Sequence, residues 1–140
     1  VNLKKEKKII DILLQLHTKN LLTAAHDISD GGLLTAICEM LFKDNLGLNL
    51  NLPKSFLKID SKDPILHSWC FGEDQGRIIV ATNKIDKVKF CLKDSNLDYF
   101  VLGKTNASNN LNLNDITTIS IKSLKNLYER TLPLIMGKDK

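Results

Sequence analysis

Two glycine-containing motifs carry the residue types that could do chemistry, and the first is AHDISDGGL, residues Ala25–Leu33. A short apolar run precedes it and a helical pattern follows it, which predicts a strand end, a tight turn and a helix start. Gly31 and Gly32 would leave backbone N–H groups uncovered at the positive end of that helix, where an anion can approach. Asp27 would set a hard oxygen beside the anion, as a Mg²⁺ ligand does, and Ser29 could donate to a phosphate oxygen. The motif is therefore a candidate nucleotide- and magnesium-binding turn.

A purely structural interpretation fits the same motif. Asp30 or Ser29 could cap the following helix, with the glycines relieving strain in the turn. The pattern alone leaves this interpretation and the binding interpretation about equal. A catalytic triad of His26, Asp27 and Ser29 is set aside, because neighbours on a strand point to opposite faces and cannot readily line up as a relay.

The second motif is FGEDQGR, residues Phe71–Arg77, which directly precedes another apolar run. Glu73, Asp74 and Gln75 stand between two glycines, and their carboxylates and amide could hydrogen-bond a hydroxylated or phosphorylated ligand. A solvent-exposed turn, in which the glycines supply positive φ angles, explains the same residues. On pattern alone the exposed turn is favoured.

Helices and strands are expected to alternate around these motifs. The segments from Lys4 to about Asn20 and from Leu33 to Leu41 have the apolar spacing of amphipathic helices. Leu46–Leu52 has the period of a half-buried strand, and Arg77–Thr82 has the composition of a buried one. The other expected elements are a strand at Leu21–Ala25, a polar connection at Pro53–Pro64, a short helix at Ile65–Trp69, a helix capped by Asn83, a strand at Tyr99–Thr105, a loop at Asn106–Asn114 and a strand at Ile116–Ile121.

A last helix is expected after the final strand, capped by Ser120 or Ser123, and Pro133 is expected to kink or end it. No internal repeat is visible. The alternation of helices and strands over residues 1–140 predicts a single α/β layered domain.

The composition is that of an ordinary soluble globular domain, with 43% hydrophobic and 26% charged residues among 140. The net charge is +4, but only Arg77 and Arg130 among the 20 basic residues are arginines, and the lysines are scattered. No apolar run approaches the length of a membrane span, and no signal-like leader is visible. Cys38, Cys70 and Cys91 have neither metal-ligand nor disulfide spacing. We therefore expect a cytoplasmic protein that binds neither nucleic acid nor membrane.

A family resemblance joins the two motifs. AHDISDGGLLTAICEM, residues Ala25–Met40, closely resembles the segment that opens the last domain of phosphoribosylformylglycinamidine synthase, an ATP-dependent amidotransferase of purine biosynthesis. FGEDQGRIIV, residues Phe71–Val80, resembles the second signature of that domain. The first helix and the tail at Leu124–Met136 also match the family's order, so the resemblance covers nearly the whole chain. Aminoimidazole ribonucleotide synthetase and selenophosphate synthetase, of the same ATP-binding superfamily, are similar in layout but differ in both turns.

The resemblance implies a fold and an activity. Residues 1–140 would be the C-terminal half of an aminoimidazole ribonucleotide synthetase-like unit, a mixed β-sheet packed with α-helices. The family converts formylglycinamide ribonucleotide, ATP and glutamine-derived ammonia into formylglycinamidine ribonucleotide, ADP and phosphate. Its ATP-grasping segments, catalytic histidine region and glutaminase have no counterpart here. The chain is therefore expected to be a fragment that contains no catalytic residue and is inactive alone.

The resemblance also implies ligands. ATP and Mg²⁺ would be the cofactors, with Asp27 as a Mg²⁺ ligand and Ser29 as a nucleotide contact beside the Gly31 and Gly32 amides. A small-molecule substrate would be contacted by the second motif, because the matching turn in the first copy of this unit contacts substrate. That carries substrate binding over to Glu73, Asp74 and Gln75.

Partners follow from the family as well. The remaining domains of the same subunit would surround this one. Only residues 137–140 follow Leu132–Met136 in this sequence, and that layout resembles the short form of the synthase. A separate glutaminase subunit and a small accessory subunit are therefore expected to supply ammonia. Two other classes stay open: the C-terminal domain of another superfamily member, and a non-catalytic ligand-binding or interaction module with a complete pocket of its own.

Overall fold

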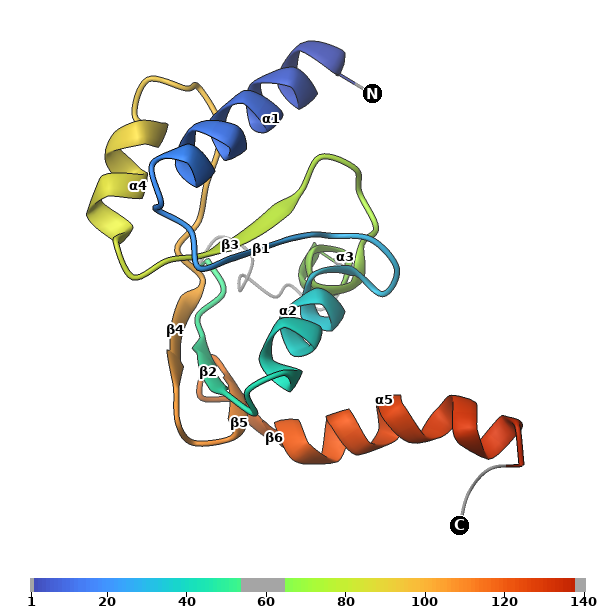
Figure 1. Cartoon of the computed structure of the whole chain (residues 1–140). Helices are drawn as coiled ribbons and strands as arrows, with labels where there is room; N and C mark the ends of the chain where they lie inside the picture. The colour runs from blue at the N-terminus through green and yellow to red at the C-terminus, as the bar shows by residue number, and fades with distance from the viewer. Residues whose placement is uncertain (1, 54–64, 138–140) are drawn as a thin grey trace. The chain divides into compact units, whose positions relative to one another are not determined.

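A computed structural model describes residues 2–53 and 65–137 as alternating helices and strands (Figure 1). In chain order the elements are α1 (Leu3–Thr18), β1 (Ala24–Asp27), α2 (Gly32–Phe42), β2 (Gly47–Leu50), α3 (Ile65–Phe71), β3 (Ile78–Ala81), α4 (Ile85–Leu92), β4 (Gly103–Asn106), β5 (Asn110–Leu113), β6 (Thr117–Ser120) and α5 (Ile121–Ile135). Within these described ranges no helix is long and apolar enough to cross a membrane. The chain is an α/β protein, as its sequence predicts.

Contacts divide the chain into two compact units. The first contains Val1–Ala36 and Trp69–Phe100, and the second contains Ile37–Ser68 and Val101–Lys140. Each unit has a sheet of its own, whereas the sequence predicts one sheet. The division falls inside α2 and α3, so each unit is assembled from two separate stretches of sequence. No shift of composition along the chain could have marked such a boundary.

The first unit pairs β1 with β3 in an antiparallel sheet of two strands, with Asp27 opposite Ile78. β3 is half-buried along its length, not fully buried as its apolar sequence predicts, because a two-stranded sheet gives each strand a single neighbour. One core cluster of this unit lies where α1 meets α4 and contains the buried side chains Leu16, Leu21 and Val88.

The second unit holds a mixed sheet in the order β4-β2-β5-β6, in which β2 and β5 are parallel and the other pairs are antiparallel. Its two faces differ in polarity. Leu48, Leu50 and Leu111 are buried on one face, while Asn49 and Asn112 pair on the other. This alternation sets the register, because a shift of one residue would expose every leucine.

The asparagine-rich segment Asn106–Asn114, which its composition predicts to be a loop, contains β5. That prediction is wrong, since β5 has β2 on one side and β6 on the other. Asparagine is depleted in strands generally, but here it alternates with leucine and occupies the polar face. Leu111, only 3% exposed, fixes the strand to the core.

Two predictions about element starts are also wrong. α4 is not capped by Asn83: its N-cap residue is Lys84, and the Lys84 backbone N–H donates to the Thr82 hydroxyl at 2.9 Å. The first strand begins at Ala24 and not at Leu21, because the Leu21 side chain packs into the helical core.

Later elements differ in extent from their predictions. The strand expected at Tyr99–Thr105 begins only at Gly103 and ends at Asn106, as β4. Helix α5 continues past Pro133 to Ile135. Proline removes one N–H from the helix, but the Met136 N–H still donates to the Leu132 carbonyl at 3.0 Å and closes the last turn. Ser120 caps α5 as predicted, accepting from the Ser123 N–H. The connection expected at Pro53–Pro64 lies almost entirely outside the described residues.

The role of β5 can be tested with Leu111→Ala. Removing this buried side chain leaves a cavity, and we expect the free energy of unfolding to fall by about 2–5 kcal/mol. Thr118→Ala, on the exposed face of neighbouring β6, is the control and should cost less than about 1 kcal/mol. Urea unfolding followed by circular dichroism measures both. Equal costs for the two variants would mean that β5 is not part of the core.

Candidate functional site

The two glycine motifs lie side by side in the first unit. β1 carries the start of the first motif and β3 follows the second, and the two strands pair antiparallel. Just beyond the strands, the Ile28 N–H donates to the Arg77 carbonyl at 2.9 Å. Residues about fifty positions apart in the sequence are therefore neighbours in the fold. The sequence predicts each motif separately and gives no register between them.

Two contacts join the turns themselves. The Gly31 N–H donates to Glu73 Oε1 at 2.9 Å. Gly32 has φ +74°, and a Cβ atom there would lie 2.5 Å from the carbonyl carbon of Phe71. No side chain fits at this point, so Gly32 permits both the left-handed turn and the close approach of the second motif.

The glycine N–H groups that the sequence offers to an anion already have protein acceptors. The Gly31 N–H is held by Glu73, and the Gly32 N–H donates to the Ser29 carbonyl at 3.0 Å. The Glu73 carboxylate thus lies beside the first turn of α2, where negative charge is favourable. An incoming phosphate would have to take its place at Gly31. Nucleotide contact by Ser29, Gly31 and Gly32 stays a prediction.

Asp27 ends β1 with its side chain 75% exposed, and its Oδ1 lies 3.7 Å from His26 Nδ1. Across residues 2–53 and 65–137, no group of three or more histidine, cysteine, aspartate or glutamate side chains is arranged to hold a metal. Asp27 can therefore give a metal one carboxylate but not a full set of protein ligands. This fits Mg²⁺ held mostly by phosphate oxygens and water. Metal binding by Asp27 stays a prediction.

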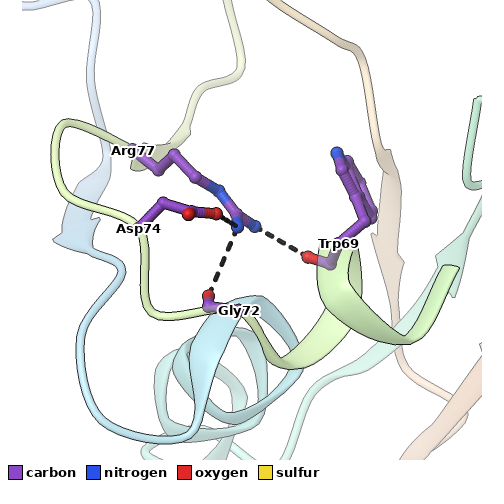
Figure 2. Close-up of polar contacts among 4 residues, drawn as sticks. All are labelled: Trp69, Gly72, Asp74 and Arg77. Carbon is purple, nitrogen blue, oxygen red and sulfur yellow. Dashed lines mark hydrogen bonds and ion pairs between the residues drawn. The ribbon is translucent and has the colours of Figure 1, made fainter. Parts of the chain in front are cut away.

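Arg77 organises the turn of the second motif (Figure 2). Its guanidinium donates to the Gly72 carbonyl at 3.3 Å, to Asp74 Oδ2 at 3.1 Å and to the Trp69 carbonyl at 2.8 Å. It also lies over the Trp69 ring, 5.9 Å from its centroid. One planar cation with five donors can hold a helix end and a turn together in this way, which a lysine cannot do.

The predicted substrate-binding residues divide into two groups. Glu73 turns toward Gly31, whereas Asp74 and Gln75 line an open cavity of about 550 Å³. The first turn of α1 forms the other wall of this cavity with Asn2, Lys5 and Glu6, while Gly76 and Arg77 complete the lining. Carboxylates, amides and two cations together can hydrogen-bond a polar ligand. Substrate contact by Glu73, Asp74 and Gln75 stays a prediction.

Sequence reasoning missed both Arg77 and the α1 residues as parts of this region. Arg77 carried a signal, since it is one of two arginines in the chain and closes the motif. The first turn of α1 carried none, because its lysines and glutamate are typical of any solvated helix start.

Two of the cysteine thiols are poorly suited to nucleophilic chemistry. Burial, with a smaller contribution from Glu39, raises the pKa of Cys38 to about 11. Burial also raises the pKa of Cys70, and the nearby Arg77 opposes that shift only in part. Since the thiolate is the nucleophile, both thiols are protonated and unreactive at neutral pH.

Comparison with known families decides where the chain belongs. The family described as "AIR synthase related protein, C-terminal domain" matches residues 1–116. The chain belongs to this family. The match spans both glycine motifs and all elements from α1 to β5.

The similarity to a curated relative covers nearly the whole chain. The phosphoribosylformylglycinamidine synthase subunit PurL of Sinorhizobium fredii is 36% identical over 141 residues, which cover 99% of this chain and 18% of the relative. The chain thus spans about a fifth of the length of such relatives. The resemblance drawn from the two motifs is confirmed.

Solved structures agree in fold. PurLQS from Thermotoga maritima matches with a TM-score of 0.69 and 22% identity, covering 86% of this chain and 21% of that one. T. maritima PurL complexed with ATP matches with a TM-score of 0.68 and 22% identity, covering 85% and 21%. The predicted α/β class with a mixed sheet is confirmed.

The role of Arg77 can be tested through Trp69, the only tryptophan of the chain. Arg77→Lys keeps the charge but loses the fork that reaches three acceptors, so we expect the Trp69 emission to shift and its quenching by iodide to change. Arg130→Lys in α5 is the control, because it replaces the other arginine and should leave the emission unchanged. An unaltered spectrum for Arg77→Lys would show that the turn keeps its form without the guanidinium.

Proposed function

We propose that this chain is the C-terminal domain of a phosphoribosylformylglycinamidine synthase large subunit, a C–N forming, ATP-dependent ligase. The observation that carries the proposal is the likeness to PurL subunits over 98–99% of the chain, from before the first motif into α5. The packing of both signature motifs against one another supports it. The domain belongs to the purine-forming reaction and is inactive without the rest of the subunit.

The proposed reaction begins at the amide of formylglycinamide ribonucleotide. The amide oxygen takes the terminal phosphoryl group of ATP, which releases ADP, and ammonia then displaces phosphate to form the amidine. Little covalent chemistry falls to the protein in phosphoryl transfer, so its task is positioning and charge stabilisation. This domain forms one wall of a nucleotide or substrate cleft.

Individual residues take positioning roles within that proposal. Asp27 offers one oxygen to Mg²⁺, which when bound offsets the charge of the phosphates. Nucleotide is contacted by Ser29, Gly31 and Gly32. In this contact the Gly31 N–H exchanges its acceptor, from Glu73 to a phosphate oxygen. The exposed end of β1 and the exposed hydrogen bond from the Gly31 N–H to Glu73 suit such an exchange.

Asp74 and Gln75 contact substrate from the wall of the cavity that they share with α1. Arg77 holds Asp74 in place for that contact. Glu73 belongs to the same substrate-contacting turn, and its carboxylate accepts a hydrogen bond from the Gly31 N–H.

Other domains and other subunits complete the enzyme. We infer that the remaining domains of the subunit, a separate glutaminase subunit and a small accessory subunit assemble with it in the cytoplasm. The likeness to PurLQS from Thermotoga maritima supports a synthase of several subunits. ATP as a ligand is supported by the neighbour complexed with ATP.

The proposed activity is tested with the complete natural polypeptide that contains this sequence. Given ATP, Mg²⁺, ammonium and formylglycinamide ribonucleotide, it should form the amidine together with ADP, and the 140-residue chain alone should form none. Chromatography with mass detection measures the product. Cyclised aminoimidazole ribonucleotide from the amidine substrate, or selenophosphate from selenide, would assign the polypeptide to another superfamily member.

The role of Asp27 is tested in the same complete enzyme. Asp27→Asn keeps the size of the side chain but removes its charge, so the affinity for Mg²⁺-nucleotide should fall by about tenfold or more. Asp30→Asn, also exposed and three residues along the chain, is the matched control and should bind normally. Calorimetric titration measures both. Unchanged affinity in Asp27→Asn at every nucleotide site would remove Asp27 from the metal site.

A further inference from the structure

The last helix, α5, is amphipathic along its whole length. Apolar residues recur at Leu124, Leu127, Leu132 and Ile135, which places them on one half of the helix circumference. The opposite half is polar and carries the residues Lys122, Lys125, Asn126, Glu129 and Arg130. In a folded protein such a helix covers its apolar side with another element.

Among the described residues of the second unit, only the first turn of α5 is covered. Ile121 is 0% exposed, and α5 contacts β5 and β6. The ring centroids of Tyr128 and Phe42 are 5.5 Å apart, and Lys125 Nζ donates to the Phe42 carbonyl at 2.9 Å. Beyond these contacts the apolar side is exposed, and Figure 1 shows this part of α5 in red.

The exposed apolar side chains lie on the same half of α5, and we call this side the α5 face. Its side chains are more than half exposed: Leu127 66%, Leu132 65%, Leu134 53% and Ile135 75%. Scattered single leucines are normal on a protein surface, but large neighbouring apolar side chains on one helix mark an interaction site. An uncovered face of this kind exposes apolar area to water, which is unfavourable.

The extent of the two kinds of similarity indicates what covers this face. The family match ends at residue 116, before β6 and α5 begin. The likeness to the PurL subunit of Sinorhizobium fredii instead covers 99% of the chain and therefore reaches into α5. Similarity over the helix is therefore found with the longer synthase subunit, of which this chain spans 18%.

We propose that the α5 face docks against an apolar surface in the rest of the synthase subunit. The proposal rests on the proposed function in one respect, since it takes the partner to be that subunit. The polar side of α5 stays in solvent, where Lys125 and Glu129 lie 3.8 Å apart as an ion pair. Docked in this way, α5 holds this domain against the rest of its own polypeptide.

The test compares the chain alone with the complete natural polypeptide. Amide hydrogen exchange in α5 should slow by about tenfold or more in the complete polypeptide, because docking protects the helix. Leu127→Lys should restore fast exchange there, since a buried unpaired charge is costly. Asn126→Lys, the adjacent exposed position on the polar side, is the matched control and should keep the protection. In the chain alone both substitutions fall on exposed positions and should leave the unfolding midpoint unchanged.

Several results would overturn the proposal. Equal exchange in the chain alone and the complete polypeptide would do so, as would equal effects of the two lysine variants. Sedimentation of the chain alone that shows a dimer lost in Leu127→Lys would assign the face to a second copy. Flotation with anionic phosphatidylserine vesicles, again lost in Leu127→Lys, would assign it to a membrane surface. None of these readouts needs enzyme activity, so the docking can fail while the proposed reaction holds, and the reverse.

Discussion

The close approach of Phe71 to Gly32 is the constraint on which the first unit depends. At a distance where a Cβ atom would lie 2.5 Å from a backbone carbon, only glycine is possible. Because the two turns touch there, Glu73 reaches the Gly31 N–H, and β1 and β3 meet in a fixed register on the other side. The motifs are therefore one structural feature in two pieces of sequence. A larger residue at position 32 would separate them and remove each turn's support for the other.

That same contact places a carboxylate where the sequence predicts an anion. A carboxylate near a helix N-terminus is worth roughly 0.3–1 kcal/mol at an exposed position, which is a weak hold. A nucleotide phosphate brings more charge and more acceptor oxygens, and a metal adds to its attraction. Occupation of the Gly31 N–H by Glu73 is thus compatible with exchange for a phosphate. It also satisfies a backbone donor when no ligand is bound, which an open anion site would leave to water.

The sequence predicted elements well wherever one period governed a long segment, as in α1 and α2. It failed at β5, because a strand of four residues with two asparagines resembles a loop in composition, and only the pairing with β2 and β6 reveals it. The division into two units was also out of reach, since each unit combines distant segments. At the candidate site the residue types were predicted, but the partner of each was not. Arg77 shows why: its acceptors are two backbone carbonyls and one carboxylate, and carbonyls have no signature in the sequence.

Amphipathic patterns in α1 and α5 show a further limit of sequence reasoning. Both helices have an apolar side and a polar side. Helix α1 buries Leu16 against α4, whereas α5 leaves most of its apolar side in solvent. Periodicity states that a helix needs a partner but not whether that partner lies in the same chain. Burial supplies the missing information, because a face that is apolar and also exposed has no partner among the described residues of its own unit. In a chain that spans about a fifth of its relatives, such a face indicates how the domain connects to a larger protein.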